Sequence, residues 1–303
     1  MTEQAGLPDL HFVLVHGACH GAWCWFKIRS LMETSGYKVT CLDLKSAGID
    51  QSNPNTILTF DEYNAPLTHF LSNLPDNEKV ILVGHSAGGL SLTDAIHRFA
   101  KKIRVAIYVA ANMLRHGFST DQDIKDGEPD VSEYGEVADL EYGMGLDQPP
   151  TSIIIKEEFQ KRLLYQLSPK EVNFQSTRTR PSITYAVNFD STFFLAFLSN
   201  PAPLIDGFVG LGQDTALASM LLRPGPVRAF KGARFEGGKD ADSVPRIYIK
   251  TLHDQMLKPM KQEQMIKRWQ PCQVLVLDSD HSPFFSTPRL LFDLISKGAA
   301  ASF

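Results

Sequence analysis

Residues 84–88 have the sequence GHSAG, a G-x-S-x-G motif with a serine at position 86. An apolar run precedes the motif (KVILVG, residues 79–84), and a helical pattern follows it over residues 86–100. A serine on such a strand-to-helix turn presents its hydroxyl at the end of a sheet, and the tight backbone accepts only small neighbours. This context favours a nucleophilic Ser86 over a purely structural glycine-rich turn. The other residues that would shape the turn are Gly84, His85, Ala87 and Gly88.

A serine hydroxyl becomes a useful nucleophile when a base accepts its proton, and a third group must orient that base. In hydrolases with this motif, the chain order is serine, acid, histidine. We expect His281 to be the base, because it follows the last strand pattern and would lie at the catalytic edge of the sheet. Asp254 follows the preceding strand and is the expected acid. The other candidates are His116 and His253 for the base, and Asp278 and Asp280 as reserve acids.

Acyl transfer also needs N–H donors for the oxyanion that forms. We expect one donor to be the amide of Ala87 and the other to be that of Ala18, in the loop HGACHG after the first strand. His16, Cys19 and His20 in this loop are of types that bind zinc. They share one short turn, and no second cluster of Cys or His completes a metal shell. We therefore expect neither a metal nor a cofactor.

The elements that would position these residues alternate between strands and helices. Apolar strands are predicted at residues 11–16, 37–44, 79–84, 103–111, 246–252 and 273–277. Helical patterns are predicted at residues 22–35, 61–74, 86–100, 157–167, 261–269 and 288–299. Continuous apolar strands between helices are typical of a parallel sheet that is covered on both faces. The sequence therefore predicts an α/β fold with a doubly wound, mostly parallel sheet.

The strand–helix alternation stops between residues 112 and 244 and resumes after them. We interpret the chain as a single domain over residues 1–303, with residues 112–244 forming a helical cap inserted before the last two strands. The cap carries acidic and Pro/Gly-rich loops beside its helical pieces. We find no internal repeat and no low-complexity tract.

Composition excludes several classes of protein and partner. The 30 basic and 34 acidic residues give a net charge of −4 without a dense basic block, so we expect no nucleic-acid partner. No apolar run reaches the roughly 18 residues of a membrane span, so we expect no membrane partner. The N-terminus lacks a signal-peptide pattern, and the 4 cysteines do not make a disulfide framework. We expect a cytoplasmic protein and leave open whether it is a homodimer.

Several longer motifs resemble one known family. The segments HFVLVHGACHGAWCWFKI, VTCLDLKSAGID, KVILVGHSAGG and SDHSPFF are similar to the plant methylesterase family of α/β-hydrolases, over about residues 10–170 and 214–298. That family includes salicylate and jasmonate methyl esterases, polyneuridine aldehyde esterase and hydroxynitrile lyases. The runs SAGGLSL, DGEPDVSEYG and DHSPFFS most resemble the branch that hydrolyses methyl indole-3-acetate.

The resemblance implies an α/β-hydrolase fold and a serine carboxylesterase that acts on the methyl ester of a small hormone-like acid. By motif, it assigns Ser86 as nucleophile, Asp254 as acid, His281 as base, and Ala18 and Ala87 as oxyanion donors. Cyanohydrin-cleaving relatives have Thr where Gly17 stands and Lys where Ser282 stands, which argues against a lyase here. The other alternative is a receptor or sink on the same fold, which binds a small ligand with slow turnover or none.

Residues 172–213 depart from the family pattern. Relatives pass from the sequence at 165–169 almost directly into the sequence at 217–224. The first and last codons of the extra segment fit the ends of a retained intron. We therefore hypothesise that it is translated intron or a gene-model error, with a genuine lid extension as the alternative. Sequencing the transcript would distinguish the two.

Overall fold

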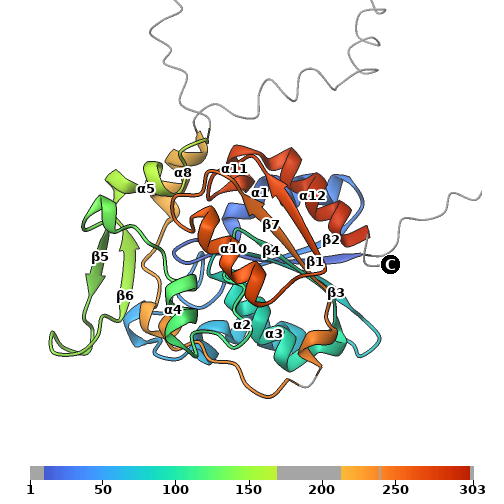
Figure 1. Cartoon of the computed structure of the whole chain (residues 1–303), viewed down its shortest axis with the longest axis horizontal. Coiled ribbons are helices and arrows are strands. Elements are labelled where there is room, and N and C mark those ends of the chain that lie inside the picture. Colours follow the sequence, from blue (N-terminus) through green and yellow to red (C-terminus); the bar gives the residue numbers. More distant parts are fainter. Residues whose placement is uncertain (1–9, 169–212, 239, 301–303) are drawn as a thin grey trace, which may run out of the picture.

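The computed structural model describes residues 10–168, 213–238 and 240–300, so the hypothesis about residues 172–213 falls outside the described residues except at Gln213. Its centre is a six-stranded sheet in the order β2-β1-β3-β4-β7-β8, with every neighbouring pair parallel (Figure 1). The strands are β1 (His11–Val15), β2 (Lys38–Leu42), β3 (Val80–His85), β4 (Ile103–Val109), β7 (Arg246–Thr251) and β8 (Gln273–Leu277). These strands occupy the predicted positions, with ends that differ by a few residues.

Helices cover both faces of this sheet (Figure 1). On one face lie α1 (Phe26–Thr34), α11 (Pro283–Ser286) and α12 (Pro288–Ala300). On the other face lie α2 (Phe60–Asn73), α3 (Gly88–Phe99) and α10 (Pro259–Arg268). Short 3-10 turns connect these elements: η1 (Ala22–Trp25), η2 (Pro54–Thr56), η3 (Ala100–Lys102), η4 (Ser132–Tyr134) and η5 (Ala241–Ser243).

Residues 12–15 of strand β1 are all apolar because both faces of the strand are buried. Successive side chains of a strand point to opposite faces of the sheet. Phe12 and Leu14 pack in the core cluster under α1 and α12, whereas Val13 and Val15 pack in the cluster under α2 and α3. All four side chains are fully buried. The two cores confirm the predicted doubly wound fold.

The strand order opens a crevice at one edge of the sheet. From β1 the chain moves outward to β2 and then returns past β1 to β3. Helices that leave two adjacent strands in opposite directions leave a gap at the carboxyl ends of those strands, where open α/β sheets bind ligands. The turn that carries Ser86 follows β3 at this edge.

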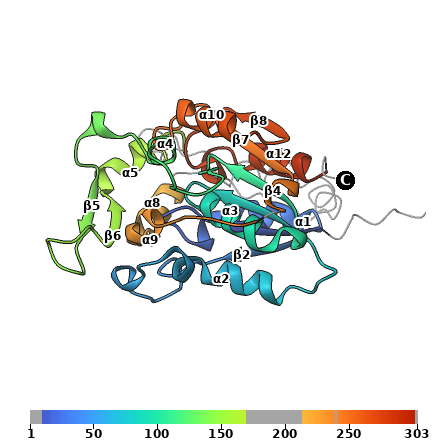
Figure 2. The same cartoon turned by 60° about the horizontal axis from the view of Figure 1, so that its bottom comes forward.

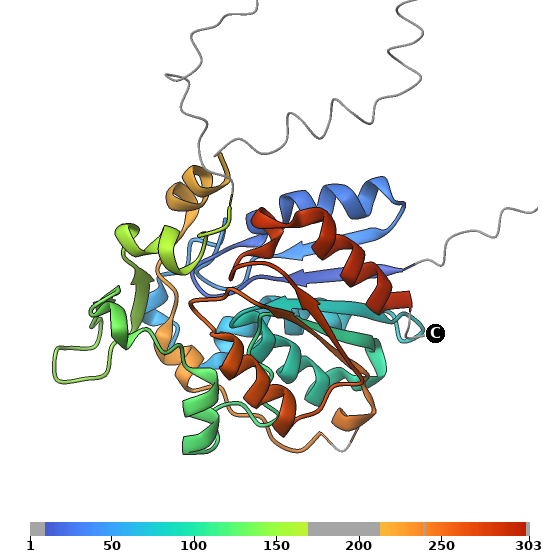
Figure 3. The same ribbon diagram turned by 45° about the horizontal axis from the view of Figure 1, so that its top comes forward.

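The described α-helices and strands between β4 and β7 lie beyond the carboxyl ends of the strands of the main sheet (Figure 3). They are α4 (Asp121–Gly127), β5 (Ala138–Glu141), β6 (Ser152–Ile155), α5 (Glu157–Leu163), α8 (Gln213–Leu221) and α9 (Val227–Lys231). Strands β5 and β6 form an antiparallel hairpin at one end of the molecule, next to α9 (Figure 2). The sequence pattern predicts only loops and helical pieces here and does not indicate the hairpin.

A reciprocal cap sets the start of α4. The Thr120 hydroxyl accepts the Asp123 N–H at 3.2 Å, and the Asp123 carboxylate accepts the Thr120 N–H at 2.9 Å. Such a capping box satisfies two backbone donors that the first turn of a helix leaves unpaired. Helix α5, by contrast, ends at Leu163, although the sequence pattern predicted a helix to residue 167. Residues 164–168 instead form turns, in which Ser168 N–H donates to Tyr165 O at 3.2 Å.

Candidate active site

Ser86 lies on a strained turn between β3 and α3. Its φ of 52° falls in the left-handed region, which non-glycine residues rarely adopt. Two backbone hydrogen bonds to the end of β4 and the residues after it hold the turn. Ser86 N–H donates to Val109 O at 3.3 Å, and Asn112 N–H donates to Ser86 O at 3.0 Å. The backbone strain is thus maintained by the end of β4, and such strain often marks a functional position.

The glycines of the motif are required by close backbone contacts. A Cβ at Gly84 would lie 2.9 Å from Gly88 O, and a Cβ at Gly88 would lie 2.6 Å from His16 O. Ordinary carbon contacts begin at about 3.5 Å. The predicted small residues are therefore needed to pack the turn against the loop that follows β1.

The structure brings Ser86, His281 and Asp254 together in one chain of hydrogen bonds. His281 Nε2 lies 3.1 Å from Ser86 Oγ, and His281 Nδ1 lies 2.8 Å from Asp254 Oδ2. A carboxylate oxygen can only accept, so the network assigns the proton to Nδ1 and leaves Nε2 able to accept from the serine. This is the arrangement that a serine nucleophile needs.

The Asp254 carboxylate is fully buried and held on both oxygens. Its Oδ1 accepts the N–H groups of Met256 and Leu257 at 2.8 and 2.7 Å. The side chain of Gln262, on α10, donates to Oδ2 at 3.3 Å and to Leu257 O at 2.8 Å. These contacts turn Oδ2 toward His281. Gln262 was missed by the sequence analysis, because an amide on an amphipathic helix carries no local signal of such a role.

The alternative bases and acids lie elsewhere. His116 Nδ1 lies 3.2 Å from Phe235 O, and the exposed His253 pairs with Asp278 at 2.5 Å. The Asp280 carboxylate accepts the Leu167 N–H at 2.8 Å and the Ser286 hydroxyl at 2.8 Å. No hydrogen bond within the described residues joins any of these groups to Ser86 or to the ring of His281.

The two expected oxyanion donors lie beside the serine. Ala18 and Ala87 line the same cavity as Ser86 and His281. Within the part of the chain that the structure describes, neither amide donates to a backbone acceptor. Free N–H groups beside a nucleophile are suited to stabilise a developing oxyanion.

The His and Cys side chains of the loop after β1 are engaged with protein partners rather than with one another. His16 Nε2 accepts the Leu44 N–H at 3.1 Å, and the Cys19 thiol donates to Ile153 O at 3.3 Å. His20 Nδ1 donates to Ala18 O at 3.0 Å, and its Nε2 accepts the Tyr165 hydroxyl at 2.8 Å. Among the described residues, no group of three or more His, Cys, Asp or Glu could hold a metal ion.

Burial sets the charge states of several side chains around Ser86 and His281. It lowers the pKa of His20 to about 3 and raises the pKa of the Cys19 thiol to about 11. It also lowers the pKa of His16 and of His85. These three histidines are therefore neutral at neutral pH, and Cys19 is a thiol rather than a thiolate.

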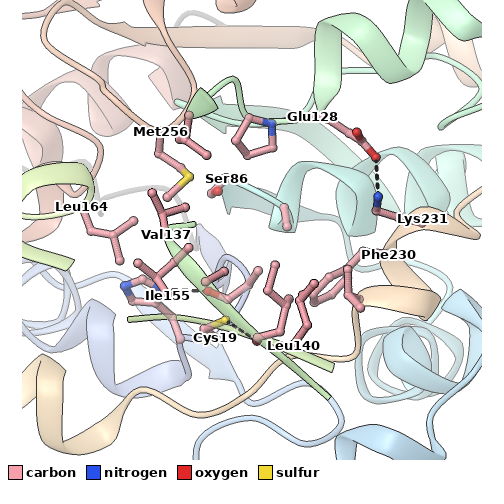
Figure 4. Close-up of a pocket in the computed structure, with 18 of the residues that line it drawn as sticks. Cys19, Ser86, Glu128, Val137, Leu140, Ile155, Leu164, Phe230, Lys231 and Met256 are labelled. Carbon is pink, nitrogen blue, oxygen red and sulfur yellow. Dashed lines mark hydrogen bonds and ion pairs between the residues drawn. The ribbon is translucent and has the colours of Figure 1, made fainter. Parts of the chain in front are cut away.

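Ser86 opens into a cavity of about 740 Å³ (Figure 4). Most of the wall is apolar and comes from the chain between β4 and β7; it includes Val137, Leu140, Ile153, Ile155, Leu164 and Phe230. One ion pair lies at the wall, between Lys231 Nζ and Glu128 Oε1 at 3.1 Å (Figure 4). The cavity suits a small, largely apolar ligand with a reacting centre at the serine.

No helix among the described residues is both long enough and apolar enough to cross a membrane.

Comparison with known proteins identifies relatives along nearly the whole chain. Residues 12–294 match the Alpha/beta hydrolase family. Methylesterase 17 of Arabidopsis thaliana is 46% identical over 295 residues, which cover 96% of this chain and 92% of that protein. Pheophorbidase of Raphanus sativus is 40% identical and covers 96% and 95% of the two chains. The crystal structure of the methylesterase protein MES16 from Arabidopsis superposes with a TM-score of 0.74 at 37% identity, covering 96% of this chain and 99% of that one.

The fold and the similarity along nearly the whole chain point to one assignment. The match to Methylesterase 17 leaves only about 4% of this chain uncovered. The chain therefore belongs to the alpha/beta hydrolase family and, within it, to the plant methylesterases, which are carboxylic ester hydrolases.

Proposed function

We propose that this protein is a serine carboxylesterase that hydrolyses the methyl ester of a small hormone-like carboxylic acid, with methyl indole-3-acetate as its substrate. The observation that carries the proposal is the chain of hydrogen bonds from Ser86 through His281 to the buried Asp254, at the base of an apolar cavity. The proposal also covers domain organisation and location. The chain forms a single domain over residues 1–303, with a cap over residues 112–244, and the protein is cytoplasmic.

In the proposed mechanism, Ser86 Oγ attacks the ester carbonyl while His281 Nε2 takes its proton. The N–H groups of Ala18 and Ala87 stabilise the oxyanion of the tetrahedral intermediate. His281 then returns the proton to the departing methanol, which leaves the acyl group on Ser86. Water, activated by His281, attacks this acyl-enzyme and releases the acid, and Asp254 supports the imidazolium that forms in each half-reaction.

The size and apolar lining of the cavity suit a flat apolar acyl group. Its volume of about 740 Å³ falls within the roughly 300–1,000 Å³ that is usual for small-molecule sites. The indole-acetate assignment is supported by the sequence motifs that this chain shares with that branch of the family. Relatives named for other substrates, such as pheophorbidase, make a direct comparison of substrates necessary.

Two positions favour hydrolysis over cyanohydrin cleavage. A Cβ at Gly17 would lie 2.8 Å from Ser86 Cβ and 3.0 Å from His85 Nδ1, so a threonine there needs a rearranged loop. Ser282 is fully buried and supplies no cation next to His281. A lyase needs a positive charge to hold the cyanide that leaves, whereas ester hydrolysis needs only water.

The proposal is tested with the methyl esters of indole-3-acetate, jasmonate and salicylate, each at several concentrations, with wild type and Ser86→Ala. We expect the highest kcat/KM for the indole ester. We also expect a loss in kcat of about 10⁴-fold or more in Ser86→Ala, as other triads show. A variant that keeps a tenth of the rate would exclude Ser86 as nucleophile. Tight binding of the acid without turnover by wild type would favour a receptor, and a preference for another ester would exclude the indole assignment.

A further inference from the structure

Three consecutive cap residues each form a hydrogen bond with a different catalytic loop. Tyr165 contacts the loop of Ala18, Gln166 contacts the loop of Asp254, and the amide of Leu167 contacts the loop of His281. We propose that residues 165–167 form a catalytic clamp, a cap segment that positions the oxyanion donor, the acid and the base together. The proposal rests on the proposed function, since it assigns positioning residues for that reaction.

The first contact reaches the oxyanion loop through His20. The Tyr165 hydroxyl donates to His20 Nε2 at 2.8 Å, and His20 Nδ1–H donates to Ala18 O at 3.0 Å. Tyr165 and His20 are 1% and 2% exposed, so no solvent competes for these bonds. Because burial keeps His20 neutral, it can accept from Tyr165 on one side of the ring while it donates on the other. The hydroxyl of Tyr165 thereby fixes the peptide unit next to the proposed oxyanion donor.

The second contact reaches the acid loop. The Gln166 side-chain amide donates to His253 O, the carbonyl directly before Asp254. The His253 N–H donates in turn to Ser279 O at 3.0 Å, which joins the acid loop to the loop of the base. The two loops are therefore tied to each other and to the cap.

The third contact reaches the base loop through the carboxylate of Asp280. Its Oδ2 accepts the Leu167 N–H at 2.8 Å, while Oδ1 accepts the Ser282 N–H at 3.1 Å and the Ser286 hydroxyl at 2.8 Å. Asp280 and Ser282 flank the base. Asp280 is fully buried, and a buried charge is costly unless such bonds satisfy it. The peptide that carries His281 is therefore set partly by the position of the cap backbone.

The same segment also forms part of the substrate wall. Leu164, one residue before Tyr165, lines the cavity, and the ring of Tyr165 packs against Phe285 with centroids 5.8 Å apart. One short stretch of chain, residues 164–167, thus both lines the acyl cavity and bonds to the three catalytic loops. A displacement of this stretch would move the wall and the catalytic groups together.

The clamp is tested by Tyr165→Phe, Asp280→Asn and the double variant, with p-nitrophenyl acetate as substrate. Each single change removes hydrogen bonding without removing core volume. We expect each to lower kcat about tenfold with KM nearly unchanged, since small displacements of catalytic groups reduce the rate rather than binding. We expect the double variant to lose only about ten- to twentyfold, because one lost anchor already frees the shared segment.

Two matched variants serve as controls. Tyr108→Phe removes a buried hydroxyl that bonds to Thr93 at 3.1 Å, away from the three catalytic loops. Asp61→Asn changes an exposed carboxylate on α2, away from the three catalytic loops, whose partner is Arg98 Nη1 at 3.1 Å. Both should keep kcat within about twofold. Thermal unfolding of every variant shows whether it folds, and Gln166→Ala replaces Asp280→Asn in the cycle if that variant does not.

Losses that multiply in the double variant, to about a hundredfold, would overturn the clamp and leave two independent supports. An increase in KM with kcat unchanged would also overturn it, because the segment would then act only as substrate wall. Failure of the proposed function is a separate result: wild type would show no ester turnover that Ser86→Ala abolishes.

Discussion

Replacing Gly17 by alanine should disable the site by a displacement that can be estimated from the structure. The added Cβ would lie 2.8 Å from Ser86 Cβ and 3.2 Å from His85 O, neither of which can rotate away. Since carbon atoms prefer about 3.5–4.0 Å, the loop after β1 and the serine turn must separate by about 0.7–1.2 Å. Ala18 follows in that loop, so the proposed oxyanion donor moves away from the reacting carbon.

A misplacement of about 1 Å costs on the order of a hundredfold in rate, and overpacking costs roughly 1–3 kcal/mol of stability. We therefore expect Gly17→Ala to lower kcat for p-nitrophenyl acetate about a hundredfold and to lower the urea midpoint modestly. The control is Gly298→Ala, whose new Cβ would have its closest contact, at 3.0 Å, with the flexible tip of Ile247 and ordinary contacts at 3.6 and 3.7 Å. It should keep kcat within about twofold. A folded Gly17→Ala enzyme with a rate within threefold of wild type would refute the argument.

Three further outcomes follow from the site. In Asp254→Asn, the backbone donors at Oδ1 would turn the amide NH₂ toward His281 and favour its wrong tautomer, so kcat should fall about 10⁴-fold with little change in KM. Gln262→Leu should lower kcat about tenfold and the free energy of unfolding by about 1–3 kcal/mol, measured in urea, because it leaves the buried Thr251 N–H without its acceptor. Burial holds the pKa of His20 at about 3, whereas the unfolded chain takes up that proton near pH 6.5. The unfolding free energy should therefore fall by up to about 1.4 kcal/mol per pH unit below 6.5, and equal urea midpoints at pH 7 and 5 would contradict this.

Much of the sheet, and the convergence of Ser86, His281 and Asp254 at one of its edges, could be predicted from sequence because their signals are local. The apolar run of β1 is continuous, since Phe12 and Val13 face different cores. The motif around Ser86 lies between a strand and a helix. The tight turn that joins the two accounts for the glycines of the motif. His281 and Asp254 could be selected because each follows a strand, and parallel strands place their carboxyl ends at one edge.

The remaining features depend on contacts between distant residues. The bond between Tyr165 and His20 joins residues far apart in sequence, and neither residue type signals such a partner. Asp280 was considered only as a reserve acid, although its carboxylate binds the cap backbone at Leu167. The hairpin of β5 and β6 was missed because its strands are only 4 residues long each, too short for a clear period.

The central claim is that Ser86 is the nucleophile, and covalent labelling tests it most directly. Diethyl p-nitrophenyl phosphate transfers its phosphoryl group to an activated serine, which mimics the acylation step. After incubation with wild-type protein, peptide mass spectrometry should find one diethylphosphoryl group per chain, on Ser86, with loss of methyl ester turnover in proportion to labelling. Turnover that persists in fully labelled protein, or inactivation with the label on another residue, would contradict the account.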